Sequence, residues 1–323
     1  MDILIVKLGA LGDVINTLPL VVNLRQRLDV NIHWLVEPLS YPLVAEHPCV
    51  DEAIIFDRNR WWWSLLQLAY HLRINHYDIA LDLQRIIKSS LFCQAASADR
   101  RIGFDRQRCK ELSWIFPFEK IPASDPTGHM VFQYLEFATY LGLNELEVRW
   151  DIPIEGKYPF DLPREFIVLN IGASKPANLW QAEKFAELAE VIEERLHVYS
   201  VLTGGRQDIG MADRIMSSYK GNNIIDLVGK TSILELKEIL YASRMVVSAD
   251  TGPMHLAVAL GKPVIALFGP SDPRRTGPFR GHVVRHPIDC SPCNRRTCPD
   301  PLCMKCIKPS DVFERIERLW LAS

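Results

Sequence analysis

An apolar run, a glycine-bearing corner and a helix follow one another in the stretch that most constrains this fold. Met245–Val247 leads into Asp250–His255, and a helix-like segment continues to Leu260. Glycine allows close backbone approach to a ligand, and a helix start offers unpaired N–H groups and a positive dipole end. A second apolar run, Val264–Phe268, ends in the polar loop Gly269–Pro273. The two loops predict a seat for the diphosphate and sugar of a nucleotide-linked donor.

The same pattern opens each half of the chain. Ile3–Val6 is apolar, the loop Lys7–Asp13 carries two glycines, and apolar residues then recur at helical spacing to Leu28. Phe166–Ile171 restarts the pattern and runs into the Gly/Ser loop Gly172–Pro176. Strand, loop and helix in alternation predict an α/β fold with parallel sheets. The glycine spacing does not match G-x-G-x-x-G, so the dinucleotide-binding fingerprint is absent.

Residues 144–164 mark the expected domain boundary, because they hold Glu, Pro, Gly and Lys with little periodicity. A chain of 323 residues suits two domains. We expect an N-terminal, acceptor-binding domain over 1–155 and a C-terminal, nucleotide-sugar-binding domain over 156–323, with a cleft between them. The last helix, Pro309 to Leu321, is a candidate to pack back on the first domain.

Composition limits the partners. The formal net charge of −2 argues against a general nucleic-acid binder. No apolar run approaches the roughly 18 residues that a membrane-spanning helix needs. The N-terminus lacks a basic segment and a small-residue cleavage site, so it is interpreted as a first strand. We therefore expect a cytoplasmic protein without a nucleic-acid partner, and peripheral contact with the inner membrane stays open.

Polar residues follow two of the predicted strands. Asp13 lies where the first loop becomes a helix, and Gln84 and Lys88 follow the buried run Tyr77–Leu83. Ligands of open α/β sheets bind beyond the carboxyl ends of the strands, which favours a general base at Asp13. A carboxylate stabilised by the helix dipole is the alternative. The residues alone leave both interpretations open.

Basic side chains gather in the first half. Arg58 and Arg60 stand beside the consecutive tryptophans Trp61–Trp63, and five further cations follow between Arg100 and Lys110. The tryptophans are interpreted as a partly buried helix start, as a site for an anionic, amphipathic acceptor, or as a membrane contact. A solvated face accounts for the basic run, but both clusters together supply the charge that an anionic acceptor requires.

Five of the eight cysteines fall in one window near the C-terminus. Two CxxC pairs have the spacing of a metal knuckle, with Cys298 between them. Disulfides are less favoured in a chain without an export signal. A structural metal and reduced structural thiols both stay open for the two pairs, Cys290 with Cys293 and Cys303 with Cys306.

Motifs along nearly the whole chain resemble those of glycosyltransferase family 9, the heptosyltransferases. Leu8–Val14 with Thr17–Pro19 is similar to the family's N-terminal motif, and Asp250–Leu256 and Phe268–Pro273 are similar to its C-terminal motifs. Further stretches look more like the first heptosyltransferase of lipopolysaccharide core assembly than the second: Trp34–Glu37, Arg58–Trp61, Asp82–Gln84 and Lys88–Ser89.

The resemblance implies a GT-B fold, with two Rossmann-like doubly wound parallel-sheet domains. It implies an inverting transfer of heptose from ADP-heptose to the Kdo of a lipid A-linked acceptor, without a metal or other cofactor in catalysis. Asp13 is then the base that deprotonates the acceptor hydroxyl. The residues assigned to the donor are Ser174, Lys175, Glu235, Asp250, Thr251, Gly252, Pro253, Met254 and His255. Those assigned to the acceptor are Gly12, Arg58, Arg60, Gln84 and Lys88.

The chain departs from the family's pattern on both the donor and the acceptor side. Asn178–Leu179 stands where a lysine commonly precedes the tryptophan matching Trp180, so Lys175 is the nearest lysine for the donor. Glu235 stands close to the place of an acidic residue that meets the ribose. Arg85 follows Gln84 where a small residue is more usual, which implies altered acceptor choice.

Heptosyl transfer to a lipopolysaccharide inner-core acceptor is the first expectation. A family 9 transferase with a protein or another glycan as its acceptor is a second interpretation. A nucleotide-sugar-binding protein without transfer activity is a third, and the absent lysine before Trp180 favours it.

Overall fold

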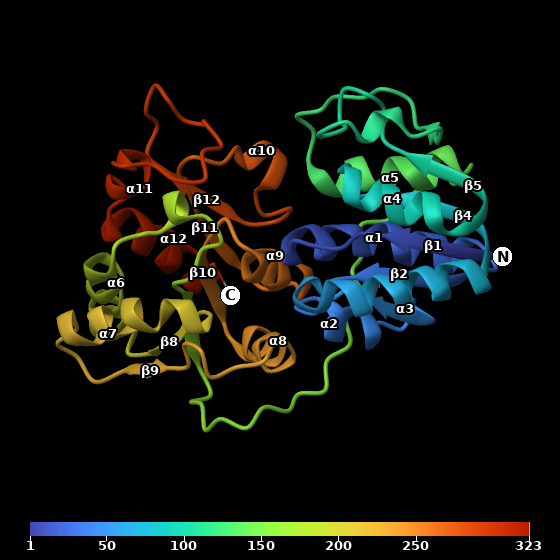
Figure 1. The fold of residues 1–323 in the computed structure, drawn as a ribbon. Coiled ribbons are helices and arrows are strands. Elements are labelled where there is room, and N and C mark those ends of the chain that lie inside the picture. Colours follow the sequence, from blue (N-terminus) through green and yellow to red (C-terminus); the bar gives the residue numbers. More distant parts are fainter. Residues whose placement is uncertain (323) are drawn as a thin grey trace. The chain divides into compact units, whose positions relative to one another are not determined.

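The computed structural model describes the backbone of residues 1–322 and the side chains of residues 1–59 and 68–322. The chain divides into two compact units, Met1–Pro153 and Ile154–Ser323. In each unit, helices lie on both faces of a parallel sheet (Figure 1).

The first unit holds a six-stranded sheet in the order β3-β2-β1-β4-β5-β6, with every neighbouring pair parallel. The strands are β1 (Asp2–Val6), β2 (Asn31–Val36), β3 (Glu52–Ile55), β4 (His76–Asp82), β5 (Ser97–Gly103) and β6 (Glu119–Lys120). The helices are α1 (Leu11–Arg27), α2 (Tyr41–Ala45), α3 (Trp61–Ile74), α4 (Ile87–Ala95) and α5 (Met130–Tyr140).

The second unit repeats this architecture with the order β12-β11-β10-β7-β8-β9, again parallel throughout. The strands are β7 (Phe166–Asn170), β8 (Tyr199–Thr203), β9 (Ile224–Asp226), β10 (Met245–Ala249), β11 (Val264–Phe268) and β12 (His282–Arg285). The helices are α6 (Ala182–Leu196), α7 (Ile209–Ser218), α8 (Ile233–Ala242), α9 (Gly252–Ala259), α10 (Pro273–Thr276), α11 (Leu302–Lys305) and α12 (Pro309–Ala322).

Both sheets have the strand order of doubly wound folds, 3-2-1-4-5-6, when each is counted from its own first strand. The order reverses between β1 and β4 in the first unit and between β7 and β10 in the second. Ligands of such folds bind at this switch point, beyond the carboxyl ends of the strands. The loops that leave these four strands are therefore the places to look for a site.

The apolar runs of the sequence become the buried strands. All five residues of β7, of β10 and of β11 are buried, because helices cover both faces of a parallel sheet. The last helix, α12, contributes Val312, Phe313 and Ile316 to the hydrophobic core of the second unit. Its packing back on the first domain stays a prediction.

A buried ion pair on α8 holds the start of the second unit. Lys237 and Glu238 are 2% and 5% exposed, and Nζ of Lys237 lies 3.3 Å from Oε1 of Glu238. The Glu238 carboxylate accepts the backbone N–H groups of Glu155 and Gly156, at 3.1 and 2.8 Å. The first residues after the division between the units are thereby fixed to α8.

Candidate active site

β1 carries Lys7 to the beginning of the first loop, and α1 starts at Leu11, with Gly12 buried in its first turn. Lys7 is 1% exposed, and its Nζ lies 3.3 Å from Oδ2 of Asp13. The Tyr134 hydroxyl of α5 donates to Oδ1 of Asp13 at 3.4 Å. The Asp13 side chain remains 36% exposed. It is therefore held by two other elements and is still open to a substrate.

The charges around Asp13 keep it ionised. Burial on its own would raise the pKa of Asp13, but the positive charges of Lys7 and Arg85 outweigh burial and leave that pKa below its usual value. Burial lowers the pKa of Lys7 to about 8, against the opposing effect of Asp13. At neutral pH the pair is a carboxylate beside an ammonium group. A rise in pH removes the proton of Lys7 first.

The buried carboxylate of Asp82 organises the loop that follows β4. Its Oδ1 accepts the backbone N–H of Gln84 at 3.2 Å and the hydroxyl of Ser89 at 2.7 Å. Burial raises the pKa of Asp82, and these hydrogen bonds oppose the rise. Oε1 of Gln84 accepts the N–H of Gly9 at 3.5 Å, which ties the β4 loop to the β1 loop.

Arg85 is buried beneath this loop, 5% exposed, with a φ of 68° in the left-handed region. Its guanidinium lies 4.9 Å from the centre of the Phe104 ring and donates to Oε1 of Gln133 at 3.2 Å. Its Nε is buried without a hydrogen-bond partner among the described residues. A buried cation costs free energy unless a negative charge compensates it. Asp13 interacts electrostatically with Arg85 as well as with Lys7, so one carboxylate acts on two buried cations.

Lys88 and Arg58, both predicted to bind the acceptor, meet at Glu37. Nζ of Lys88 lies 3.0 Å from Oε1 of Glu37, and Nε of Arg58 lies 3.6 Å from the same oxygen. Among these three groups, one carboxylate stands between two cations. The side chains of Arg60 and of Trp61–Trp63 lie outside the described residues.

In the second unit, the loop after β10 contains Thr251, the N-cap residue of α9. Its hydroxyl does not cap the helix, since it lies 3.1 Å from the Ser248 hydroxyl and accepts from Nδ2 of Asn170 at 3.3 Å. Asn170 ends β7, so this network joins the two strands at the switch point. The N-cap side chain therefore leaves the first N–H groups of α9 to another acceptor, as an anion-binding helix start requires.

The predicted donor residues in the loops after β10 and β7 differ in how deeply they are buried. Gly252 and Pro253 begin α9, Met254 and His255 are 0% and 6% exposed, and the backbone N–H of His255 bonds to the carbonyl of Thr251. The side chain of Asp250 accepts the Thr276 hydroxyl at 3.5 Å. Ser174 is exposed and Lys175 half-buried in the loop after β7.

Asn178–Leu179 stands where the resemblance suggests a lysine, and Asn178 is 1% exposed. Its Nδ2 donates to the carbonyl of Asp250 at 3.4 Å and to the hydroxyl of Ser271 at 3.5 Å. Its Oδ1 is buried with no hydrogen-bond partner among the described side chains and backbone. The asparagine therefore links the loop after β10 to the loop after β11.

Glu235 forms a capping box at the start of α8. Its Oε2 accepts the N–H of Ser232 at 2.7 Å, and the Ser232 hydroxyl accepts the N–H of Glu235 at 3.2 Å. Contact of Glu235 with a ribose stays a prediction. Gly172 marks a close approach at the same sheet edge, because a Cβ there would lie 2.4 Å from Oδ2 of Asp208.

The cysteine window does not form a ligand cluster. Cys290 is exposed, Cys303 is buried, and all the thiols are free. Burial raises the pKa of Cys303. Across the described side chains, no group of three or more His, Cys, Asp or Glu residues is arranged to hold a metal ion. The metal knuckle suggested by the CxxC spacing is thus without structural support.

Several residues of these sites escaped the sequence reasoning: Lys7, Glu37, Tyr134 and Asn170. Lys7 gave a usable signal, because it directly follows the apolar run Ile3–Val6, at a strand end where a ligand site is expected. Tyr134 gave none, since its contact with Asp13 spans 121 residues of sequence.

Comparisons with known proteins agree with this architecture. The family model "Glycosyltransferase family 9 (heptosyltransferase)" matches residues 65–303. The chain is 27% identical to a lipopolysaccharide core heptosyltransferase, OpsX, of Haemophilus influenzae, over 85% of this chain and 81% of that protein. It is 26% identical to lipopolysaccharide heptosyltransferase 1 of Pseudomonas aeruginosa, over 100% and 99%. The structure of E. coli heptosyltransferase WaaC with ADP superposes with a TM-score of 0.81 at 24% identity, over 99% and 100%.

The predicted α/β class, with two Rossmann-like doubly wound parallel sheets of the GT-B type, is confirmed. None of the helices in the described part of the chain has the length and apolar character needed to cross a membrane.

Proposed function

Because this chain belongs to glycosyltransferase family 9 (heptosyltransferase), we propose that it moves heptose from ADP-heptose to the Kdo of a lipid A-linked inner-core acceptor. The observation that carries the proposal is the Lys7–Asp13 ion pair at the switch point of the first sheet, with Asp13 36% exposed. Relatives named as lipopolysaccharide heptosyltransferases favour an acceptor of this class.

The donor is assigned to the second unit. The start of α9 presents N–H groups that the Thr251 side chain does not satisfy, which suits a diphosphate. Lys175 and Ser174 lie on the neighbouring loop after β7, where they add a cation and a hydroxyl. The solved relative WaaC was captured with ADP, which supports an adenosine diphosphate leaving group.

The acceptor is assigned to the first unit. Lys88 and Arg58 share the single carboxylate of Glu37, so an acceptor carboxylate or phosphate can replace part of that pairing. Gln84 lies on the adjoining β4 loop. Arg60 belongs to the same proposed acceptor set by its position in the sequence.

In the proposed reaction, Asp13 takes the proton of the acceptor hydroxyl as the oxygen attacks the anomeric carbon of the heptose. The bond from that carbon to the phosphate oxygen breaks, and ADP leaves with the electron pair. Attack from the face opposite ADP inverts the anomeric configuration. The negative charge that grows on the diphosphate is stabilised by the start of α9, so we propose that the transfer requires no metal.

Lys7 and Tyr134 are proposed as positioning residues for Asp13. Lys7 keeps the carboxylate ionised, and the two partners fix its orientation from β1 and α5. A base held in one orientation loses less entropy when it meets the hydroxyl. The arrangement also makes the ammonium charge of Lys7 a condition for activity.

A lipid-linked acceptor would place the enzyme at the cytoplasmic face of the inner membrane, as a peripheral protein. A different acceptor, a protein or another glycan, is the main alternative. The buried Asn178 at the expected lysine position favours a further alternative, a sugar-nucleotide-binding protein without transfer.

The test is mass spectrometry of the products formed from ADP-heptose with Kdo-lipid A, a peptide and other glycans. We expect a mass increase of one heptose on Kdo-lipid A alone, and with Asp13→Asn a product that forms far more slowly. Product on another acceptor would replace the proposed one. ADP-heptose binding by calorimetry without any product would establish the binding protein instead.

A further inference from the structure

The loop between β5 and β6 exposes a cluster of apolar side chains that the proposed chemistry does not use. Leu112 and Ile115 are 53% and 57% exposed. Trp114 and Phe116 lie half-buried beside them, and Pro117 is exposed. Single exposed apolar residues are normal, but a group of this size within one short loop marks a contact surface. We refer to residues 106–117 as the 106–117 loop.

Hydrogen bonds to the β4 loop and to the start of α4 hold the 106–117 loop in place, so its apolar side chains stay on the surface. The Ser113 hydroxyl, 2% exposed, donates to the carbonyl of Arg85 at 3.0 Å. The backbone N–H of Lys110 donates to the same carbonyl at 2.8 Å. Oε2 of Glu111 accepts the N–H of Ile87 at 2.9 Å, which attaches the loop to the start of α4. Leu112 and Ile115 could become buried in the core only if these hydrogen bonds broke.

The surface continues onto α4. Leu91 lies one turn after Ile87 on the same face of the helix and is 54% exposed. Gln84 and Lys88, proposed for the acceptor, lie next to the residues that anchor the loop, Arg85 and Ile87. The apolar surface is therefore adjacent to the proposed acceptor site within the first unit.

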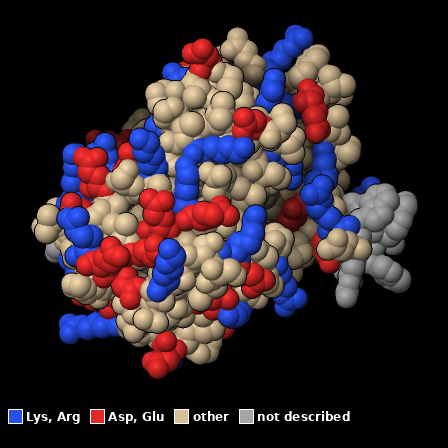
Figure 2. Space-filling view, turned by 90° about the vertical axis from the view of Figure 1, so that its left-hand side faces the viewer, with Lys and Arg blue, Asp and Glu red and all other residues tan. Residues whose placement is uncertain are grey.

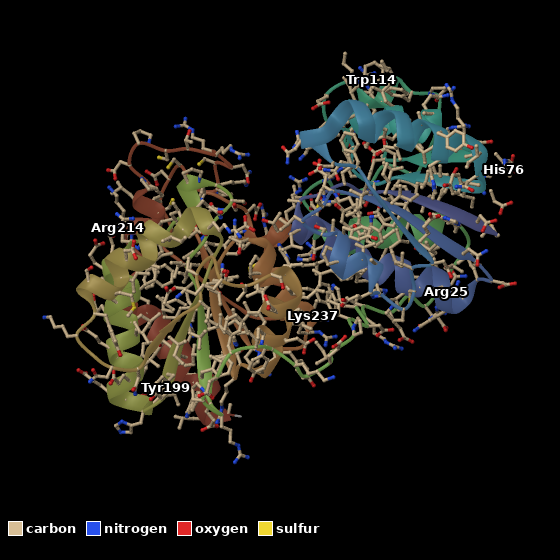
Figure 3. All side chains as sticks on the ribbon, turned by 60° about the horizontal axis from the view of Figure 1, so that its bottom comes forward. Arg25, His76, Trp114, Tyr199, Arg214 and Lys237 are labelled. Carbon is tan, nitrogen blue, oxygen red and sulfur yellow. The ribbon has the colours of Figure 1, made fainter. Side chains whose placement is uncertain are left out.

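The charge of the loop suits an anionic layer. Exposed Arg106 lies with its guanidinium 4.2 Å from the centre of the Trp114 ring, and Lys110 is also exposed. The carboxylate of Glu111 is engaged at the start of α4. Figure 3 shows Trp114 at the outer edge of the first unit. By contrast, the face drawn in Figure 2 has positive and negative side chains interspersed.

We propose that the 106–117 loop and Leu91 dock on an anionic lipid surface. Leu112, Ile115 and Leu91 enter the acyl boundary, Trp114 lies at headgroup level, and Arg106 pairs with lipid phosphates. Aliphatic and aromatic groups with a cation beside them match what a lipid surface offers, an acyl boundary for the apolar side chains and anionic headgroups for the cation. The choice of a membrane rests on the proposed function, because the acceptor there is lipid-linked.

The test is co-flotation of the full-length protein with phosphatidylcholine vesicles, with and without phosphatidylglycerol. We expect flotation with the mixed vesicles and little with phosphatidylcholine alone. Leu112→Ser and Ile115→Ser should each weaken partitioning about tenfold, and Arg106→Gln about fivefold. Leu321→Ser is the matched control, because Leu321 is 82% exposed in the second unit and should not matter.

A second measurement separates docking from the transfer itself. With a water-soluble, deacylated Kdo acceptor, the Leu112→Ser Ile115→Ser double variant should turn over like wild type, and with vesicle-embedded acceptor it should be slower. Vesicle binding that the double variant retains would overturn the docking surface and leave the proposed function intact. Loss of a dimer on sedimentation, without any vesicle binding by wild type, would assign the surface to a second copy. Flotation without turnover on any Kdo acceptor would retain docking and reject the proposed function.

Discussion

The two switch points have the same strand order but hold different kinds of groups. Beyond β1 and β4, the first unit gathers charges: Lys7 against Asp13, with Arg85 buried nearby. Beyond β7 and β10, the second unit gathers neutral amides and hydroxyls, with Asn170 bonded to Thr251. Since the sheets are alike, the difference comes from the loops that leave them.

This difference matches the proposed division of roles, in which the first unit holds the catalytic base and the second unit binds the donor. A proton acceptor must be a titratable group whose ionisation is controlled, and the charged cluster provides that control. A seat for a dianionic phosphate needs N–H donors that stay available. A network of neutral groups serves this purpose, because it holds the backbone in place, while the carboxylate of Asp250 beside it accepts the Thr276 hydroxyl. The predictions below test this division, from the largest expected effect to the smallest.

Asp13→Asn should lower kcat by about 10²- to 10⁴-fold, the usual contribution of a general base. The affinity for ADP-heptose should stay unchanged, because the donor is assigned to the other unit. ADP release gives kcat and calorimetry gives Kd. Asp99→Asn, at a 64% exposed position on β5, is the control that should keep wild-type activity. A donor affinity that falls together with kcat would contradict the division of roles.

Lys7→Met should lower kcat by about 10- to 100-fold, since the base is no longer held in place. In wild type, activity should fall as pH rises through about 8, where Lys7 loses its proton. The acid limb should lie below the usual carboxylate range, because the pKa of Asp13 is lowered. In the variant, the alkaline limb disappears and the acid limb moves to higher pH, since a cation that lowered the pKa of Asp13 is gone.

The conservative variant Lys7→Arg distinguishes charge from shape at this position. An arginine keeps its charge at all accessible pH values, so the alkaline limb should disappear while the acid limb stays low. An alkaline limb near pH 8 that persists in both variants would assign it to another group.

Thr251→Val should raise the KM for the donor about five- to tenfold and leave kcat nearly unchanged. The variant removes one of three acceptors of the buried Asn170 amide, while Ser248 and the Gly172 carbonyl remain, and this loosens the start of α9. Initial rates at varied ADP-heptose give both constants, and Thr231→Val, just before α8, is the control. A large effect on kcat would mean that the neutral network takes part in the chemistry as well.

Lys88→Ala should raise the acceptor KM only about two- to fivefold, because its ion pair with Glu37 is partly exposed. The effect should shrink as salt is added. Arg58→Ala should have a smaller effect still, since Arg58 is 69% exposed and 3.6 Å from Glu37. Titration of the acceptor at low and high ionic strength measures both, and a change in donor KM would contradict the assignment.

Local pattern predicts the sheets and the positions of the loops, because buried parallel strands must be apolar on both faces. Phe166–Ile171 and Val264–Phe268 are runs of this kind, and each corresponds closely to a strand. Side-chain partners across the fold are harder to predict. The contact of Tyr134 with Asp13 and the links made by Asn178 join segments that no local pattern relates.

The cysteine pairs illustrate the same limit. CxxC spacing brings two thiols close within one turn, but a metal site needs two such turns to face each other. Cys303 lies in the core of the second unit and interacts electrostatically with Cys293 and Cys290, yet the described side chains form no group that could hold a metal ion. The CxxC spacing predicts the distance between the two thiols within each turn. It does not predict how the chain between the two turns runs.

The Glu238 carboxylate also determines where residues can be inserted into the segment at the start of the second unit. It accepts two consecutive backbone N–H groups, from Glu155 and Gly156, so those residues behave as part of α8. Lys157 is the next residue and is exposed, and it lies beyond the two N–H groups that Glu238 accepts. Extra residues inserted after Lys157 would lengthen the segment and leave both hydrogen bonds to Glu238 intact. An insertion between Glu155 and Gly156 would separate two donors that depend on one carboxylate, and would leave a buried charge half-satisfied.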